Sequence, residues 1–195
     1  MGTEALEKIF LYWLCHLPDA GALQIRRIGE AAGGFQQAYY IEGTQLWKKG
    51  IFKKEENALR FDAWKGEFSR LEEEYYKLSE KGIYFITPLD EEYPRRLYSV
   101  YDYPLGLYVK GSLPKEDKAT AAVIGARNCT AYGREAAGYM AKELAAAGIQ
   151  IISGMALGID GAGHEGAMAA GGMTYAVLGC GVDQCYPRRN FDLYE

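Results

Sequence analysis

Three short apolar runs in the second half of the chain, each followed by a glycine-containing loop, constrain the fold more than any other feature. The runs are 121–124, 149–152 and 174–178. Segments long enough to form a helix separate them, and this alternation is typical of consecutive βαβ units in a parallel sheet. We therefore expect an α/β fold in which the loops after the strands meet at the carboxyl edge of the sheet, where ligands bind.

Composition places the 195-residue chain among ordinary globular proteins, with 49% hydrophobic and 25% charged residues. No apolar run approaches the roughly 18–20 residues that a membrane-spanning helix needs, and acidic residues stand where a secretory signal would be basic. We therefore expect a cytoplasmic protein with no membrane partner. The net charge of −4 argues against the generally basic surface of many nucleic-acid-binding proteins, but it is compatible with a local cluster of cations that binds phosphates.

Signals for a metal or a cofactor are missing. The loop after the first run lacks the G-x-G-x-x-G fingerprint, the second run ends in Ser153-Gly154 rather than in an acidic residue, and there is no Walker motif. No cysteine belongs to a C-x-x-C pair, which argues against zinc. The cysteines are Cys15, Cys129, Cys180 and Cys185. We expect no cofactor.

The chain divides into three expected parts. Residues 1–82 form a helical domain, with helices from residue 6, at 22–32, 35–40 and 44–49, and one long helix over 54–80. Residues 83–118 are a connector with strands at 83–86 and 107–109. Residues 119–195 hold the parallel sheet. Because doubly wound sheets usually have about five or six strands, we expect this domain to be incomplete.

Arg127 is the strongest single candidate for an anion-binding residue. It lies two positions after Gly125, at the end of the first apolar run, where a guanidinium group could grip a phosphate with two parallel hydrogen bonds. The alternative is a structural salt bridge to Asp160. Ser153, Gly154 and Gly158 could add a hydroxyl and backbone N–H groups to the same site, although a tight strand-to-helix turn also needs glycine.

Asp160 and His164 are four residues apart and would share one face of a helix. This spacing could mark a catalytic acid–base pair. The commoner explanation, which we favour, is structural: Asp160 caps the N-terminus of the helix and His164 packs or hydrogen-bonds nearby.

Taken together, these residues resemble the DprA/Smf family of bacterial DNA-processing proteins. The resemblance is close from about residue 93 onward, where several motifs follow one another in the family's order. They are Tyr93-Pro94, Asp102-Tyr103-Pro104, Leu107–Gly111, Val123–Arg127, Tyr132-Gly133, Ser153–Asp160, His164, Gly166–Met168, Ala176–Asp183 and Tyr186–Asn190. The helices around 18–21 resemble a degenerate helix-hairpin-helix or SAM-like domain more loosely.

The resemblance implies a Rossmann-like domain that binds single-stranded DNA without base specificity, preceded by the small helical domain. In the family the protein protects incoming DNA in natural transformation, loads the RecA recombinase and forms a homodimer, and no catalytic turnover is implied. The dimer contacts are expected beyond residue 195, so we expect no such dimer here. The expected DNA-binding residues are Gly125, Arg127, Ser153, Gly154, Gly158, Arg188, Arg189 and Asn190.

One departure from the family bears on this site. Met173 stands where family members often carry a basic residue, and Arg188 and Arg189 could compensate for it. The main alternative function is that of a phosphoribohydrolase of the lysine-decarboxylase-like (LOG) type, which would need a P-G-G-x-G-T loop and a nearby catalytic glutamate. Neither occurs up to Glu195. A nucleotide-binding regulatory domain stays open as a third reading.

Overall fold

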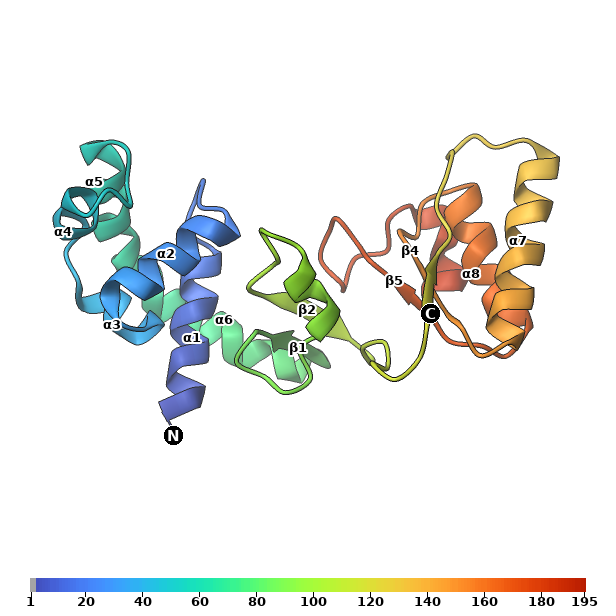
Figure 1. The fold of residues 1–195 in the computed structure, drawn as a ribbon, viewed down its shortest axis with the longest axis horizontal. Helices are drawn as coiled ribbons and strands as arrows, with labels where there is room; N and C mark the ends of the chain where they lie inside the picture. The colour runs from blue at the N-terminus through green and yellow to red at the C-terminus, as the bar shows by residue number, and fades with distance from the viewer. Residues whose placement is uncertain (1–2) are drawn as a thin grey trace. The chain divides into compact units, whose positions relative to one another are not determined.

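A computed structural model describes residues 3–195 of the chain (Figure 1). Its backbone contacts divide it into two compact units, residues 1–111 and 112–195. The N-terminal unit consists of helices followed by an antiparallel strand pair. Its elements are α1 (Thr3–Cys15), α2 (Ala22–Ala32), α3 (Phe35–Tyr40), α4 (Gly43–Lys48), α5 (Glu55–Trp64), α6 (Phe68–Glu80), β1 (Ile83–Ile86) and β2 (Leu107–Lys110).

Helix α1 forms the centre of the N-terminal unit. Leu11, Trp13 and Leu14 of this helix have no exposed surface, and α1 packs against α3 and α6. The two short helices that follow α2 borrow their N-terminal caps from distant carboxylates. Glu7 accepts a hydrogen bond of 2.7 Å from the Phe35 N–H of α3, and Asp62 accepts one of 2.9 Å from the Gly43 N–H of α4. Long-range contacts therefore hold helices that are too short to be stable alone.

The single helix expected over 54–80 is wrong. Helix α5 ends at Trp64, a 3-10 turn spans Lys65–Glu67, and α6 begins at Phe68. Trp13 and Trp64 each donate their indole N–H to the other's carbonyl oxygen, at 3.2 and 3.3 Å, which ties the end of α5 to α1. The break lets Phe61 of α5 and Phe68 of α6 both pack against the Trp13 ring.

The C-terminal unit is an α/β fold with a three-stranded parallel sheet, as the sequence predicts. Its elements are β3 (Thr120–Ala122), α7 (Ala131–Ala146), β4 (Gln150–Ser153), α8 (Ile159–Ala169), β5 (Thr174–Ala176), a 3-10 turn (Arg188–Asn190) and α9 (Phe191–Tyr194). The strands stand in the order β3-β4-β5. The first and third strands are shorter than expected, because Ile124 and Val177 already lie in exposed loops.

Small residues let the two helices of this unit pack closely on one face of the sheet. The core combines Ala141 and Ala145 of α7, Ala167 of α8 and Ile151 of β4. Helices α7 and α8 lie side by side (Figure 1), and a Cβ atom at Gly166 would collide with the backbone of Gly138. A larger residue at this crossing would push α8 away from α7.

Asp160 joins the loops that follow β3 and β4. The expectation that it caps helix α8 is wrong, because Gly158 is the N-cap residue and Asp160 lies in the first turn. The residue is 7% exposed, and its carboxylate accepts hydrogen bonds from the Gly125 N–H at 3.3 Å and from the Gly154 N–H at 3.1 Å. One buried anion thus satisfies a backbone donor from each loop.

His164, one turn further along α8, hydrogen-bonds to the last strand. The Thr174 hydroxyl donates to the Ile151 carbonyl oxygen, so it accepts from His164 Nδ1–H at 2.6 Å. Nε2 of the imidazole is buried and has no hydrogen-bond partner among the described residues. Burial lowers the pKa of His164, and the nearby Asp160 carboxylate offsets part of this effect.

Replacing Asp160 should destabilise the C-terminal unit. In Asp160→Ala, the N–H groups of Gly125 and Gly154 lose their acceptor, and the loss of two hydrogen bonds to a charged group should cost about 2–3 kcal/mol. Hydrogen exchange measured by mass spectrometry should show faster exchange in β3, β4 and α8. The control Glu135→Ala, at an exposed position of α7, should leave exchange unchanged. Equal protection in both variants would show that the carboxylate contributes nothing to the fold.

The C-terminal unit should lose stability as the pH falls below about 6.5, the usual pKa of histidine in unfolded chains. Because the folded state holds His164 at a lower pKa, the unfolded state binds more protons in this range, and acid favours unfolding by at most about 1.4 kcal/mol per pH unit. Urea titrations at about pH 5.5 and 7.5, followed by the amide NMR signals of α8, should show this dependence.

His164→Asn should remove this dependence, since the amide cannot titrate. His16→Asn, in the N-terminal unit, should retain it. A pH dependence that survives in His164→Asn would assign it to another group.

Candidate functional site

Three loops meet at the carboxyl edge of the parallel sheet. Asp160 ties the loop after β3 to the loop after β4. The segment after β5 joins them through Asn190, whose side-chain amide donates to the carbonyl oxygens of Met155 at 2.8 Å and Ala156 at 3.2 Å. Loops at this edge form the usual ligand-binding position of parallel α/β sheets.

Gly158 sets how closely the first loop approaches helix α8. Its φ of 79° lies in the left-handed region, and a Cβ atom there would collide with the carbonyl groups of Ala126 and Arg127. The Ile159 N–H also donates to the Ala126 carbonyl oxygen at 3.3 Å. The backbone of the first loop therefore rests on the start of α8, and this contact fixes where the Arg127 side chain begins.

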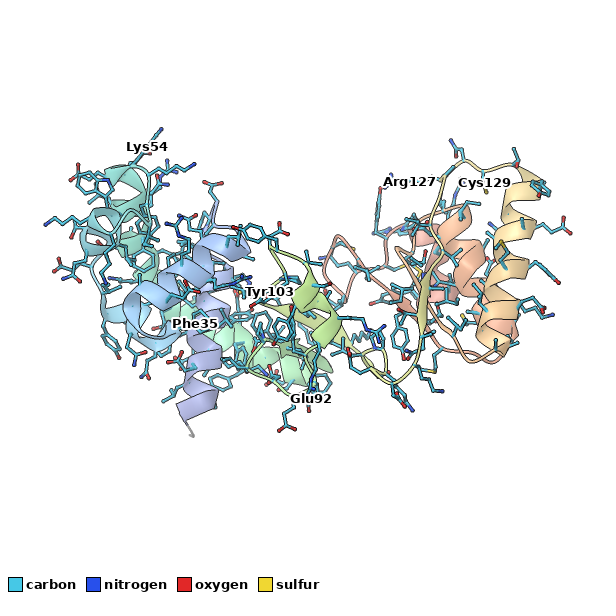
Figure 2. The ribbon with its side chains drawn as sticks, viewed as in Figure 1. Phe35, Lys54, Glu92, Tyr103, Arg127 and Cys129 are labelled. Atoms are coloured by element: carbon cyan, nitrogen blue, oxygen red, sulfur yellow. The ribbon has the colours of Figure 1, made fainter. Side chains whose placement is uncertain are left out.

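Arg127 is exposed, and its side chain makes no hydrogen bond or ion pair within residues 3–195 (Figure 2). The salt bridge to Asp160 that the sequence left open is not formed, because that carboxylate binds the two glycine N–H groups. The guanidinium group keeps its donors available to an anion from solution.

Three other expected phosphate donors already serve the fold. The N–H groups of Gly125 and Gly154 donate to Asp160, so a carboxylate of the chain itself occupies the position expected for a phosphate. Ser153 is 2% exposed, and its hydroxyl donates to the Val123 carbonyl oxygen at 2.5 Å. These groups position the loops in this structure, and their contact with DNA stays a prediction.

The segment after β5 adds two further cations. Arg188 and Arg189 lie exposed on the 3-10 turn, and neither side chain has a hydrogen-bond or ion-pair partner in the described part of the chain. Asn190 differs from them, since its amide donors bind the loop after β4. The donors that stay open at this edge are therefore guanidinium groups.

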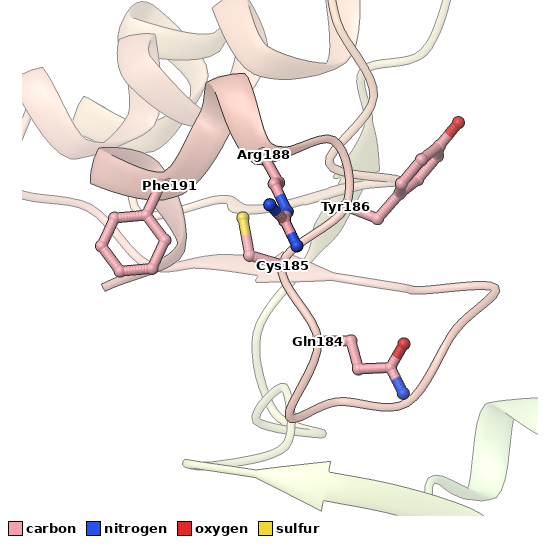
Figure 3. Close-up of a pocket in the computed structure, with 5 residues that line it drawn as sticks. All are labelled: Gln184, Cys185, Tyr186, Arg188 and Phe191. Atoms are coloured by element: carbon pink, nitrogen blue, oxygen red, sulfur yellow. The ribbon is translucent and has the colours of Figure 1, made fainter.

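An open pocket of about 730 Å³ lies beside these arginines (Figure 3). Gln184, Cys185, Tyr186, Arg188 and Phe191 line it. Only Arg188 among them was expected from the sequence. The sequence does carry one signal for the aromatic lining residues, since Tyr186 and Phe191 flank the basic pair Arg188-Arg189. A search for apolar periodicity does not detect this arrangement.

Other kinds of site find no support in the described residues. No group of three or more His, Cys, Asp or Glu side chains among residues 3–195 is arranged to hold a metal ion. No helix in the described part of the chain is long and apolar enough to cross a membrane.

Comparison with known proteins supports one family. The family profile described as DNA recombination-mediator protein A matches residues 84–195. The chain is 38% identical over 117 residues to DNA processing protein DprA of Bacillus subtilis, covering 60% of this chain and 39% of that protein. It is 38% identical over 112 residues to Protein Smf of Escherichia coli, covering 57% of this chain and 30% of that protein.

A solved structure extends the similarity to the N-terminal unit. The X-ray structure of DNA processing protein A (DprA) from Streptococcus pneumoniae matches with a TM-score of 0.72 and 26% identity, covering 97% of this chain and 62% of that one. The chain thus spans less than two thirds of the relatives that it matches. Since the family profile matches more than half of the chain in sequence, the protein belongs to the DprA/Smf family of DNA recombination-mediator proteins.

Proposed function

We propose that this chain binds single-stranded DNA without base specificity at the carboxyl edge of its parallel sheet, as part of a recombination mediator. The observation that carries the proposal is the set of guanidinium groups at that edge, those of Arg127, Arg188 and Arg189, which are exposed and have no partner within residues 3–195. Guanidinium groups bind phosphate oxygens in pairs, and phosphates are common to every DNA sequence.

The charge distribution supports a local DNA site rather than a general attraction. The whole chain carries a net charge of −4, so it should repel DNA except where cations are concentrated. A cation on a neighbouring helix is engaged. Arg134 on α7 donates from Nη2 to both carboxylate oxygens of Glu165 at 2.7 Å. The open arginines of the loops thus differ from the paired arginine of the helix.

The same edge supports binding rather than turnover. The spacing of Asp160 and His164 suggested a catalytic acid–base pair, but neither side chain is available to a substrate. His164 is 2% exposed, and the Asp160 carboxylate already accepts hydrogen bonds from two backbone N–H groups. A general acid or base needs hydrogen-bond reach to the reacting group. We therefore assign no enzymatic activity to this site.

For the whole protein we infer a role in the cytoplasm that protects incoming DNA and loads the RecA recombinase, with a second copy as partner. The support is membership of a family described as recombination mediators. The chain covers 62% of the solved relative, so these partner interactions belong to the longer family protein.

The chain should bind a labelled single strand of roughly 20 nucleotides more tightly than a duplex of that length. Arg127→Ala should weaken binding of the single strand about tenfold, because one charge-assisted contact is lost. Since each neutralised phosphate releases counterions, the slope of log K against log salt should become shallower by about 0.7. Fluorescence anisotropy across a salt series measures both effects.

Arg134→Ala is the matched control, because the Arg134 guanidinium is already paired with Glu165. It should leave DNA affinity unchanged, and both variants should unfold at the temperature of the parent. An equal loss in the two variants, or equal affinity for single strand and duplex, would contradict the proposed site.

A further inference from the structure

The pocket beside Arg188 presents two aromatic rings to solvent. Tyr186 is 67% exposed and Phe191 is 48% exposed, and both line the pocket together with the Arg188 guanidinium (Figure 3). The two rings lie on opposite sides of Arg188 (Figure 3), and exposed aromatic surface of this kind is unfavourable in water and is typical of a binding site. The pairing of flat rings with an unpaired cation suits a ligand that has both a π face and negative charge.

The walls of this pocket are held in place by hydrogen bonds. The Tyr194 hydroxyl donates to the Val182 carbonyl oxygen at 2.7 Å, and the Gln184 N–H donates to the Gly181 carbonyl oxygen at 2.9 Å. The Asn190 N–H donates to the Pro187 carbonyl oxygen at 3.0 Å. The loop that carries the rings is therefore ordered before a ligand binds, which lowers the loss of conformational entropy on binding.

The pocket is large and open enough to take nucleotides of a longer strand. Its volume of about 730 Å³ lies within the range of roughly 300–1,000 Å³ typical of small-ligand sites. Gln184 contributes an amide that can both donate and accept a hydrogen bond, so it can meet the edge of any base.

The pocket also belongs to the same edge as Arg127. Asn190, between Arg188 and Phe191, binds the Met155 and Ala156 carbonyl oxygens in the loop after β4, and Asp160 links that loop to the loop of Arg127. A strand whose phosphates contact the arginines would therefore bring its bases to the neighbourhood of the rings.

We propose that this pocket is a nucleobase subsite in which unpaired bases of a single strand stack on the exposed rings at its two ends, those of Tyr186 and Phe191, with Arg188 between them. The proposal rests on the proposed function, which supplies the strand. In a duplex each base is paired and stacked, so only a single strand can place a base here without paying for unpairing. The subsite thus gives a physical reason for preferring single strands, which phosphate contacts alone do not supply.

The test separates bases from phosphates. Fluorescence anisotropy compares an oligothymidine with an oligonucleotide of the same length whose bases are replaced by abasic tetrahydrofuran residues. The chain should bind the oligothymidine about tenfold more tightly. Phe191→Leu and Tyr186→Leu should each reduce this difference, while their affinity for the abasic strand stays that of the parent.

Two controls address the rings themselves. Tyr186→Phe keeps the ring and should bind like the parent. Tyr139→Leu removes a tyrosine of similar exposure, 64%, from α7, away from the pocket, and should change nothing. As a measurement that needs no variant, the ring NMR signals of Tyr186 and Phe191 should shift on adding the oligothymidine and not on adding the abasic strand.

The outcomes distinguish this inference from the proposed function. Equal binding of both strands would overturn the base subsite and leave the phosphate-binding edge standing, whereas binding of neither strand would overturn both. Thymidine monophosphate should compete weakly, because it lacks neighbouring phosphates. Competition as strong as that of the oligothymidine would identify a free-nucleotide site and overturn the assignment to a strand.

Discussion

The buried carboxylate of Asp160 is the interaction on which the C-terminal unit depends. It accepts one backbone N–H from the loop after β3 and one from the loop after β4. Glycine-containing loops after parallel strands offer N–H groups that attract anions, and here the chain supplies its own anion for them. This internal contact holds the loops together before any ligand arrives, and it leaves the recognition of an external anion to side chains.

This separation between groups that hold the loops and groups that are open to a ligand explains why the candidate site consists mainly of arginine side chains. Groups that the sequence suggested as phosphate donors, such as the Ser153 hydroxyl and the Asn190 amide, hydrogen-bond to backbone carbonyl oxygens instead. Arg127, Arg188 and Arg189 have no such partners in the described part of the chain. The polar groups that hold the loops together are hydrogen-bonded within the protein, whereas the arginine side chains at the edge have no partner among the described residues. These guanidinium groups can therefore form strong charge-assisted hydrogen bonds to phosphates.

The N-terminal unit shows where local sequence patterns suffice. Helices α2 and α3 and strand β1 have the bounds expected from the sequence, because turn residues flank them and tertiary contacts agree with local preference. The break between α5 and α6 was missed because its cause lies outside the segment. The reciprocal hydrogen bonds of Trp13 and Trp64 join residues 51 positions apart, and no local propensity encodes them.

The same distinction applies to the candidate site. The alternation of apolar runs and helical segments by itself determined the α/β class, the parallel sheet and the position of Arg127 in the loop after a strand, because hydrophobic periodicity and chain order are local properties. Only the tertiary structure decided which donors are free. The partner of Asp160 at Gly125 is 35 residues away, and so is that of Asn190 at Met155. The pocket lined by Tyr186 and Phe191 likewise depends on the folded structure, because it forms between the loop after β5 and the start of α9. A hydrogen bond or a cavity wall depends on which distant residues meet, and that meeting is a property of the folded chain.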